Sequence, residues 1–171
     1  MGQRFAMSIA VYVIDTSYLV ELFGCGRFSN KTASGLVRKR FAAAINAGGR
    51  FFVPLPCLFE LGNHIADVPN GALRQQLADY LLNTVRESLK TSKPWTITPT
   101  GPPEEILPSL LARFVPLAAK QGIGLVDTFT LDEALRLKQK FEKYKARTHI
   151  WTNDRVLKRH EPDPELKPYL W

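Results

Sequence analysis

Short apolar runs that alternate with longer amphipathic segments are the feature that most restricts the fold of this chain. Runs of strand-forming residues occur at 9–14, 50–54, 95–98 and 148–151, and the segments between them have helical spacing. Alternating strands and helices favour a parallel sheet with helices on both faces. With 171 residues, the chain is long enough to bury one core. The sequence therefore predicts an α/β fold, a three-layer α/β/α sandwich with a central parallel sheet, in a single domain over residues 1–171.

The segments between the strands also carry more detailed predictions. A helix is expected to begin at Asp127 or Thr128. Another helix follows Pro102, and Pro108 and Pro116 are expected to make it irregular, because proline donates no backbone hydrogen bond. In two further helices, at 31–47 and 72–90, apolar spacing predicts which side chains face the core: Leu36, Val37, Phe41, Ala44, Ile45, Leu73, Leu77, Leu81, Leu82 and Val85.

Four acidic residues stand at the end of apolar runs or one turn beyond them: Asp15, Glu60, Asp127 and Asp154. In an open α/β sheet the carboxyl ends of the strands face one crevice. Carboxylates gathered there repel one another and persist only where cations neutralise them. Hard ions take oxygen ligands, which favours Mg²⁺ or Mn²⁺. The pattern therefore predicts a metal-dependent phosphodiesterase site.

Neighbouring hydroxyl residues suit a supporting role at such a site. Asp15, Asp127 and Asp154 form the expected ligand core. Glu60 is expected to bind the ion directly or through water. A bound ion lowers the pKa of water and clamps phosphate oxygens, as phosphodiester hydrolysis requires. Three hydroxyl residues are placed to hydrogen-bond the carboxylates or the phosphate: Thr16, Ser17 and Thr152.

Each acidic residue also has a structural interpretation that needs no ligand. Asp15 and Asp127 are typical helix caps. Asp154 suits a turn, and Glu60 suits the exposed side of a helix. Asp132 is expected to face solvent. Three histidines lack metal-ligand spacing and a nearby nucleophile, and are expected at the surface or in the core: His64, His149 and His160.

The charge of the chain suits a polyanionic partner. Lys and Arg number 23 against 16 Asp and Glu, which gives a net charge of +7 and a pI near 9.6. If four acids lie in one site, the remaining surface has 23 basic against 12 acidic residues, which suits a substrate held by its phosphates. A basic pI that only aids solubility is the alternative. Basic residues that either contact phosphates or lie in solvent gather late in the chain: Lys143, Lys145, Arg147, Arg155, Lys158 and Arg159.

The sequence predicts no membrane partner. No run approaches the roughly 18 apolar residues of a membrane-spanning helix. The apolar stretch at 9–14 is short, β-branched and ends in Asp15, unlike a signal peptide. Cys25 and Cys57 form no metal or redox motif and are expected as buried thiols. We therefore expect a reducing, cytoplasmic location.

Four motifs that occur in this order resemble those of PIN domains, and most closely those of the VapC-like ribonuclease toxins. They are Val13-Ile14-Asp15-Thr16-Ser17, Leu58-Phe59-Glu60-Leu61, Gly124-Leu125-Val126-Asp127-Thr128-Phe129 and Trp151-Thr152-Asn153-Asp154. The resemblance covers residues 9–158. It implies an α/β/α sandwich, Mg²⁺ or Mn²⁺, endonucleolytic cleavage of RNA, a homodimer and a cognate antitoxin protein.

Three other functions remain open. The 67 positions from Glu60 to Asp127 form a longer separation than a compact toxin has, so a non-toxin PIN-domain RNA-processing nuclease is one alternative. A non-catalytic PIN-like module that binds RNA or a protein is another, although a complete set of acids argues against it. A phosphatase of the haloacid-dehalogenase kind would require a second aspartate where this chain has Ser17.

Overall fold

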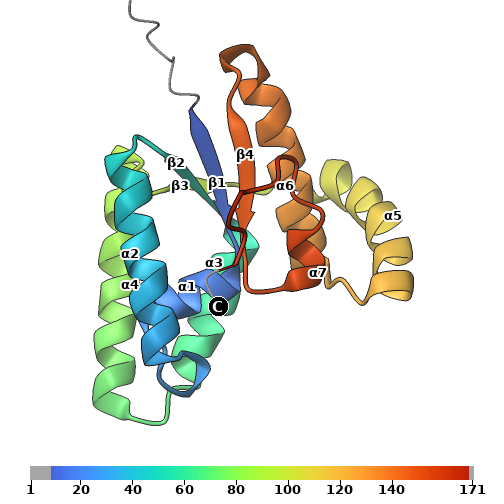
Figure 1. The fold of residues 1–171 in the computed structure, drawn as a ribbon. Coiled ribbons are helices and arrows are strands. Elements are labelled where there is room, and N and C mark those ends of the chain that lie inside the picture. Colours follow the sequence, from blue (N-terminus) through green and yellow to red (C-terminus); the bar gives the residue numbers. More distant parts are fainter. Residues whose placement is uncertain (1–8, 170–171) are drawn as a thin grey trace, which may run out of the picture.

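Four parallel strands form one sheet at the centre of the computed structural model, which describes residues 9–169 (Figure 1). They are β1 (Ala10–Ile14), β2 (Arg50–Pro54), β3 (Thr96–Thr98) and β4 (Arg147–Trp151). Their order across the sheet is β3-β2-β1-β4, and Val13 pairs with both Phe52 and Ile150. The predicted α/β fold with a parallel sheet is confirmed, and each strand lies within one residue of its expected bounds.

The strand order creates a switch point between β1 and β4. From β1 the chain moves outward to β2 and β3, and it then crosses to the opposite side, where β4 pairs with β1. In sheets of this kind, ligands bind outside the carboxyl ends of the strands at such a point. Ile14 and Trp151 are paired at the ends of β1 and β4. Asp15 and Thr152 follow them directly and therefore lie at the switch point.

Helices cover both faces of the sheet, an arrangement consistent with the predicted three-layer sandwich. Figure 1 shows α1–α4 on one side and α5–α7 on the other. The helices are α1 (Thr16–Phe23), α2 (Lys31–Asn46), α3 (Leu55–Ala66), α4 (Gly71–Thr91), α5 (Pro103–Gln121), α6 (Leu125–Phe141) and α7 (Arg155–Lys158). Two short 3-10 helices occupy Gly26–Phe28 and Glu142–Tyr144.

Alternate strand residues point into two separate hydrophobic cores. On β2, Phe51 and Val53 pack with helices α1–α4, whereas Phe52 packs with α6. On β4, Trp151 joins the first core and Ile150 the second. Burial of one such side chain contributes about 1.5–3 kcal/mol. Because these strands are covered on both faces, they are apolar at successive positions, which explains the apolar runs in the sequence.

The helices differ from expectation in three respects. First, α5 is one continuous helix through Pro108 and Pro116. Both prolines are exposed, so the carbonyl groups that lose a donor face water. Second, α6 begins at Leu125, two residues before Asp127, because its N-cap is Gly124. Third, α2 and α4 lie on the outside of their layer and bury only a narrow stripe, so three residues expected in the core are exposed: Leu36, Ile45 and Leu82.

The C-terminal tail covers the outer edge of β4. The Ile150 amide donates to Glu161 Oε2 (3.0 Å), and the Thr148 amide donates to Asp163 Oδ2 (2.7 Å). The Asp163 amide in turn donates to the Thr148 carbonyl (3.1 Å). Side-chain carboxylates therefore take the place that a fifth strand would occupy, which is one way in which proteins protect a sheet edge.

Two smaller predictions concern the thiols and the membrane. Cys25 and Cys57 are buried and free, as predicted. Within residues 9–169, no helix combines the length and the hydrophobicity needed to cross a lipid bilayer.

Candidate metal centre

Asp15 is held by groups from both central strands. It follows β1, is the N-cap of α1 and is only 4% exposed. Its Oδ2 accepts hydrogen bonds from Ser17 Oγ (2.8 Å), from the Ser17 amide (3.3 Å) and from Thr152 Oγ1 (2.8 Å). Two of the three predicted supporting residues, Ser17 and Thr152, therefore contact this carboxylate directly.

Glu60 reaches the same region from helix α3. It lies in the second turn of that helix and is partly buried. Its Oε2 accepts a 2.6 Å hydrogen bond from Thr16 Oγ1. Because Thr16 adjoins Asp15 in the chain, this bond ties α3 to the end of β1. The third supporting residue thus positions Glu60 rather than Asp15.

Asp154 lies after β4 and caps α7. Its Oδ1 accepts from the amides of Val156 (2.6 Å) and Leu157 (3.1 Å). Its own amide donates to Thr152 Oγ1 (3.0 Å), which links it to the group that holds Asp15. Asp15 therefore has the capping role that the sequence left open, and Asp154, for which the sequence suggested a turn, is also a cap; in each case capping engages one carboxylate oxygen.

Asp127 brings helix α6 to the same place. It is the third residue of α6, and its Oδ2 accepts from the Gly124 amide (3.2 Å). Burial is the largest cause of a raised pKa at Asp127, which reaches about 6. The negative charges of Asp15, Asp154 and Glu60 add to the rise, whereas the Gly124 amide opposes it. Asp127 therefore lies close enough to the other three carboxylates to be affected by their charges, and we call the four residues the acidic cluster.

Each carboxylate of the acidic cluster has one oxygen held by the protein and one that is not. Within residues 9–169, the oxygens without a hydrogen bond are Asp15 Oδ1, Glu60 Oε1, Asp127 Oδ1 and Asp154 Oδ2. In the same residues, no ion pair with Lys, Arg or His involves the cluster. Four unengaged oxygens without a protein cation form a donor set that suits a hard divalent ion such as Mg²⁺ or Mn²⁺.

The acidic cluster is more open than a preformed metal cage. In the part of the chain that the structure describes, the group whose metal-binding atoms all lie within 4.8 Å of one another is His149, Glu161 and Glu165. Lys158 Nζ lies 2.7 Å from Glu161 Oε2 and 2.5 Å from Glu165 Oε2, so an ammonium already balances these carboxylates. Mg²⁺ keeps several of its waters and needs few direct carboxylates. The wider spacing of the acidic cluster therefore fits an ion held partly through water.

Lys158 differs from both expectations for the late basic residues, because it neither lies in solvent nor is free to contact phosphates. It is 2% exposed, and besides its two carboxylate partners it donates to the Ile150 carbonyl (2.8 Å). A buried and fully paired ammonium has no free donor for a phosphate. The sequence held a signal, since Glu161 and Glu165 follow closely, but only the folding back of the tail brings all three together.

The histidines and Asp132 have structural roles. His149 is buried, and its Nδ1 lies 2.6 Å from the Asp163 carbonyl. Burial lowers the pKa of His149 despite the acidic groups around it. His160 Nε2 contacts Gln121 Oε1 at 2.7 Å. Asp132 lies outside the acidic cluster, as expected, and its partly exposed carboxylate pairs with Arg113.

Gly124 is a site residue that the sequence reasoning missed. Its amide holds Asp127, and a Cβ at this position would lie only 3.1 Å from Asp127 Oδ2. A larger residue would therefore crowd the carboxylate. The available signal was a glycine directly before an apolar helical segment, since glycine is among the accepted N-cap residues.

Comparisons with known proteins do not indicate a function for this chain. A search with protein-family models finds no match to the chain, and a search of curated proteins finds none either. The acidic cluster and its surroundings therefore carry the functional argument.

Proposed function

We propose that the protein is a PIN-like, Mg²⁺- or Mn²⁺-dependent endoribonuclease that hydrolyses phosphodiester bonds of RNA. One observation carries the proposal: four carboxylates from four different elements approach the β1–β4 switch point, each with an unengaged oxygen and none with a cationic partner in the described residues. Repulsion among these carboxylates destabilises the folded protein unless a bound ligand neutralises their charge. A divalent ion is the ligand with the matching charge and donor preference.

The protein would contribute orientation to the reaction. A bound ion would supply activation of water and stabilisation of charge in the transition state. Three donors fix Asp15 Oδ2, and Thr16 fixes Glu60 Oε2, so the second oxygen of each carboxylate has a set direction. Hydrogen bonds of this kind hold metal ligands in place and preserve their affinity.

The choice of RNA as the substrate has two supports of different kinds. The surface outside the cluster is strongly basic, with 23 Lys and Arg in the chain, which suits a polyanion. The preference for RNA over DNA rests on the resemblance to PIN domains. The same resemblance supports a role as the toxin of a VapBC-type pair, with a cognate antitoxin and a homodimeric state.

The proposal is tested by cleavage of a single-stranded RNA with purified protein. Cleavage is expected with Mg²⁺ or Mn²⁺ and should stop in a chelator. Asp127→Asn keeps the size of the side chain but removes a ligand charge. We expect it to lower the rate about a thousandfold, equivalent to about 4 kcal/mol of lost transition-state stabilisation. Asp67→Asn, in an exposed residue at the end of α3, is the matched control and should keep the wild-type rate.

Two outcomes would contradict the proposal. Undiminished cleavage in chelator would exclude a metal-dependent reaction. A wild-type rate in both Asp15→Asn and Asp127→Asn would exclude the acidic cluster as its site. Binding of RNA without any cleavage would instead favour the non-catalytic module, for which the open spacing of the cluster is the supporting observation.

A further inference from the structure

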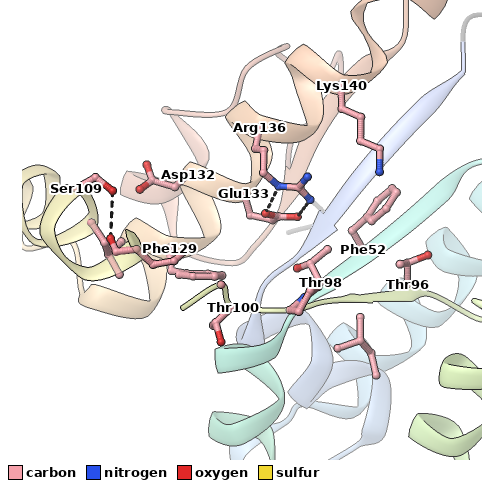
Figure 2. A pocket seen from close by; sticks show the side chains of 15 residues that line it. Phe52, Thr96, Thr98, Thr100, Ser109, Phe129, Asp132, Glu133, Arg136 and Lys140 are labelled. Carbon is pink, nitrogen blue, oxygen red and sulfur yellow. Dashed lines mark hydrogen bonds and ion pairs between the residues drawn. The ribbon is translucent and has the colours of Figure 1, made fainter. Parts of the chain in front are cut away.

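Two neighbouring hollows lie on the α6 side of the sheet. The first, of about 290 Å³, has an apolar lining and lies between the first turns of α5 and α6. The second, of about 570 Å³, extends along β3 to Arg136 and Lys140 (Figure 2). The two hollows share five lining residues: Thr100, Gly101, Ile106, Leu110 and Phe129. They therefore adjoin each other, and together we call them the α5–α6 groove.

One end of the α5–α6 groove adjoins the acidic cluster. Leu125 and Val126, which line the apolar part, directly precede Asp127 in α6. Pro56, on the same wall, lies one helical turn before Glu60 in α3. At 1.5 Å per helical residue, the basic side chains Arg136 and Lys140 of the groove lie about 13–20 Å beyond Asp127 along α6.

The apolar part has the lining that an unstacked nucleobase requires. Phe129 lies where the two hollows meet, and Leu107, which is 44% exposed, borders the apolar hollow. Bases bind proteins by resting on aromatic and apolar side chains, with little dependence on their identity. Bases are free to do this in single strands, whereas in a duplex they are paired and stacked.

The far part of the groove has donors that suit a phosphate. Arg136 uses Nε and Nη2 to bind the two oxygens of Glu133 (2.8 and 2.6 Å), which neutralises that buried carboxylate (Figure 2). Within the described residues, Nη1 of Arg136 has no hydrogen bond and Lys140 has no ion pair. Asp132, the other acid of the wall, pairs with Arg113. Lys140 therefore leaves the wall with a net positive charge.

We infer that the α5–α6 groove carries single-stranded RNA away from the acidic cluster, with a base in the apolar part and a phosphate at Arg136 and Lys140. The inference rests on the proposed function, since the cluster is where that RNA would be cut. The nearness of Leu125 and Val126 to Asp127 and the free cationic groups of Arg136 and Lys140 at the far end favour RNA over a protein segment as the occupant.

The test measures binding in a chelator, so that it does not depend on cleavage. The probes are a short single-stranded RNA and inorganic polyphosphate, which carries phosphates but no bases. Leu107→Asn alters the apolar part, and Leu111→Asn is its control, one turn farther along α5 with nearly the same exposed fraction, 43% against 44%, but outside the groove. Lys140→Gln alters the far part, and Lys39→Gln on the opposite layer removes the same charge from an exposed site.

Each variant has a distinct expected result. Leu107→Asn should weaken RNA binding about tenfold and leave polyphosphate binding unchanged, because only RNA has a base to lose its contact. Lys140→Gln should weaken both and reduce the salt dependence of RNA binding by about 0.7 in log–log slope, as for one lost phosphate contact. Both control variants should bind as the wild type, and thermal melting should show that all four variants remain folded.

Failure of the inference and failure of the proposed function can be told apart. If Leu107→Asn and Lys140→Gln bind RNA as tightly as the wild type, the inference is overturned and the groove is left to a protein partner, whatever the cleavage assay gives. If both variants bind RNA weakly but the wild type cuts no RNA with metal, the groove remains an RNA site and the nuclease proposal fails.

Discussion

Thr152 connects two members of the acidic cluster through a single hydroxyl. Its Oγ1 donates to Asp15 Oδ2 (2.8 Å) and accepts from the Asp154 amide (3.0 Å), and the residue is 1% exposed. A hydroxyl has one donor and two acceptor sites, so both bonds form at once. The position therefore couples the burial of Asp15 to the turn that presents Asp154.

Replacement of Thr152 by valine is expected to reduce activity and stability together. Valine has the same shape but leaves the Asp154 amide without its partner and removes one of the three donors to Asp15 Oδ2, at a cost of about 1–3 kcal/mol. Loss of a group that orients metal ligands typically lowers activity about 10–100-fold. Thermal melting and the rate of metal-dependent RNA cleavage would measure the two effects.

Thr148→Val on the same β4 segment is the matched control. Thr148 is fully buried, yet its Oγ1 has no hydrogen-bond partner among the described residues. Removal of an unsatisfied buried hydroxyl should leave stability unchanged or raise it slightly. Equal effects of the two substitutions would contradict the role assigned to Thr152.

Sequence reasoning identified the residues around Asp15 because they are local. Ser17 lies two residues away, and the order Asp-Thr-Ser is that of a capped helix after a strand. The link from Thr16 to Glu60 spans 44 positions, and the link from Thr152 to Asp15 spans 137. No local pattern encodes such pairs, since they depend on which strands become neighbours. The residue types were therefore predictable and their partners were not.

At the scale of elements, the tail is attached to the sheet by charge. Glu165 accepts from Trp151 Nε1 (3.2 Å) and pairs with Arg40 (2.7 Å) as well as Lys158 (2.5 Å). Burial alone would raise the pKa of Glu165, but the positive charges of Lys158 and Arg40 and the hydrogen bonds lower it overall. The tail is therefore most firmly held when this carboxylate is ionised.

This attachment predicts a loss of stability in acid. A carboxyl whose folded pKa is depressed contributes stability above its unfolded pKa, about 4.3 for Glu, and loses it as the pH falls through the lower folded pKa. The free energy of unfolding should therefore decline below about pH 4.3. Glu165→Gln should lower it by about 1–3 kcal/mol at neutral pH and remove this part of the decline, as measured by denaturant unfolding across the pH range.

Glu87→Gln is the control, because Glu87 is exposed on α4 and forms no ion pair in the described residues. Its unfolding should follow that of the wild type at each pH. An acid profile of Glu165→Gln that coincides with the wild-type profile would contradict the assigned role of the tail.

The elements themselves were largely readable from the sequence. Strands buried on both faces give apolar runs, and such runs predicted β1 and β2, whereas β-branched and aromatic residues predicted β3 and β4. The helices were harder, because outer helices such as α2 and α4 bury a narrow stripe and leave apolar residues exposed. The helix α5 was predicted after Pro102, but its continuity through Pro108 and Pro116 was not, since local rules for proline take no account of the exposure of both rings.

At the scale of the whole molecule, an acidic cluster lies within a basic protein. Among 23 basic and 16 acidic residues, four acids gather at the switch point, so 23 basic residues stand against 12 acidic ones in the rest of the chain. The strand order that defines the switch point was not readable from the sequence, because apolar runs do not state which strands pair. The expectation of one shared crevice therefore depended on the fold class rather than on a known topology.

This charge distribution and the PIN-like motifs predict that the chain inhibits growth when it is produced alone in a bacterial host. Wild-type protein should arrest growth by cutting cellular RNA, and Asp15→Asn should not, because it lacks a ligand charge. Growth curves and RNA integrity at matched levels of soluble protein would show the difference.

Equal growth of the two strains would argue against the toxin role and favour an RNA-processing or RNA-binding function. Arrest by both would show that the effect does not come from the acidic cluster.

The carboxylates of the tail make the two margins of the sheet unequal. At β4, Glu161 and Asp163 already occupy the amides that another strand would need. At β3, the order of the sheet ends with a strand of three residues that has no outer neighbour in the described chain. A strand donated by another polypeptide would therefore meet available backbone groups at one margin only. Strand addition would therefore occur only at β3. It would stop after one added strand unless that strand had an unpaired outer edge of its own.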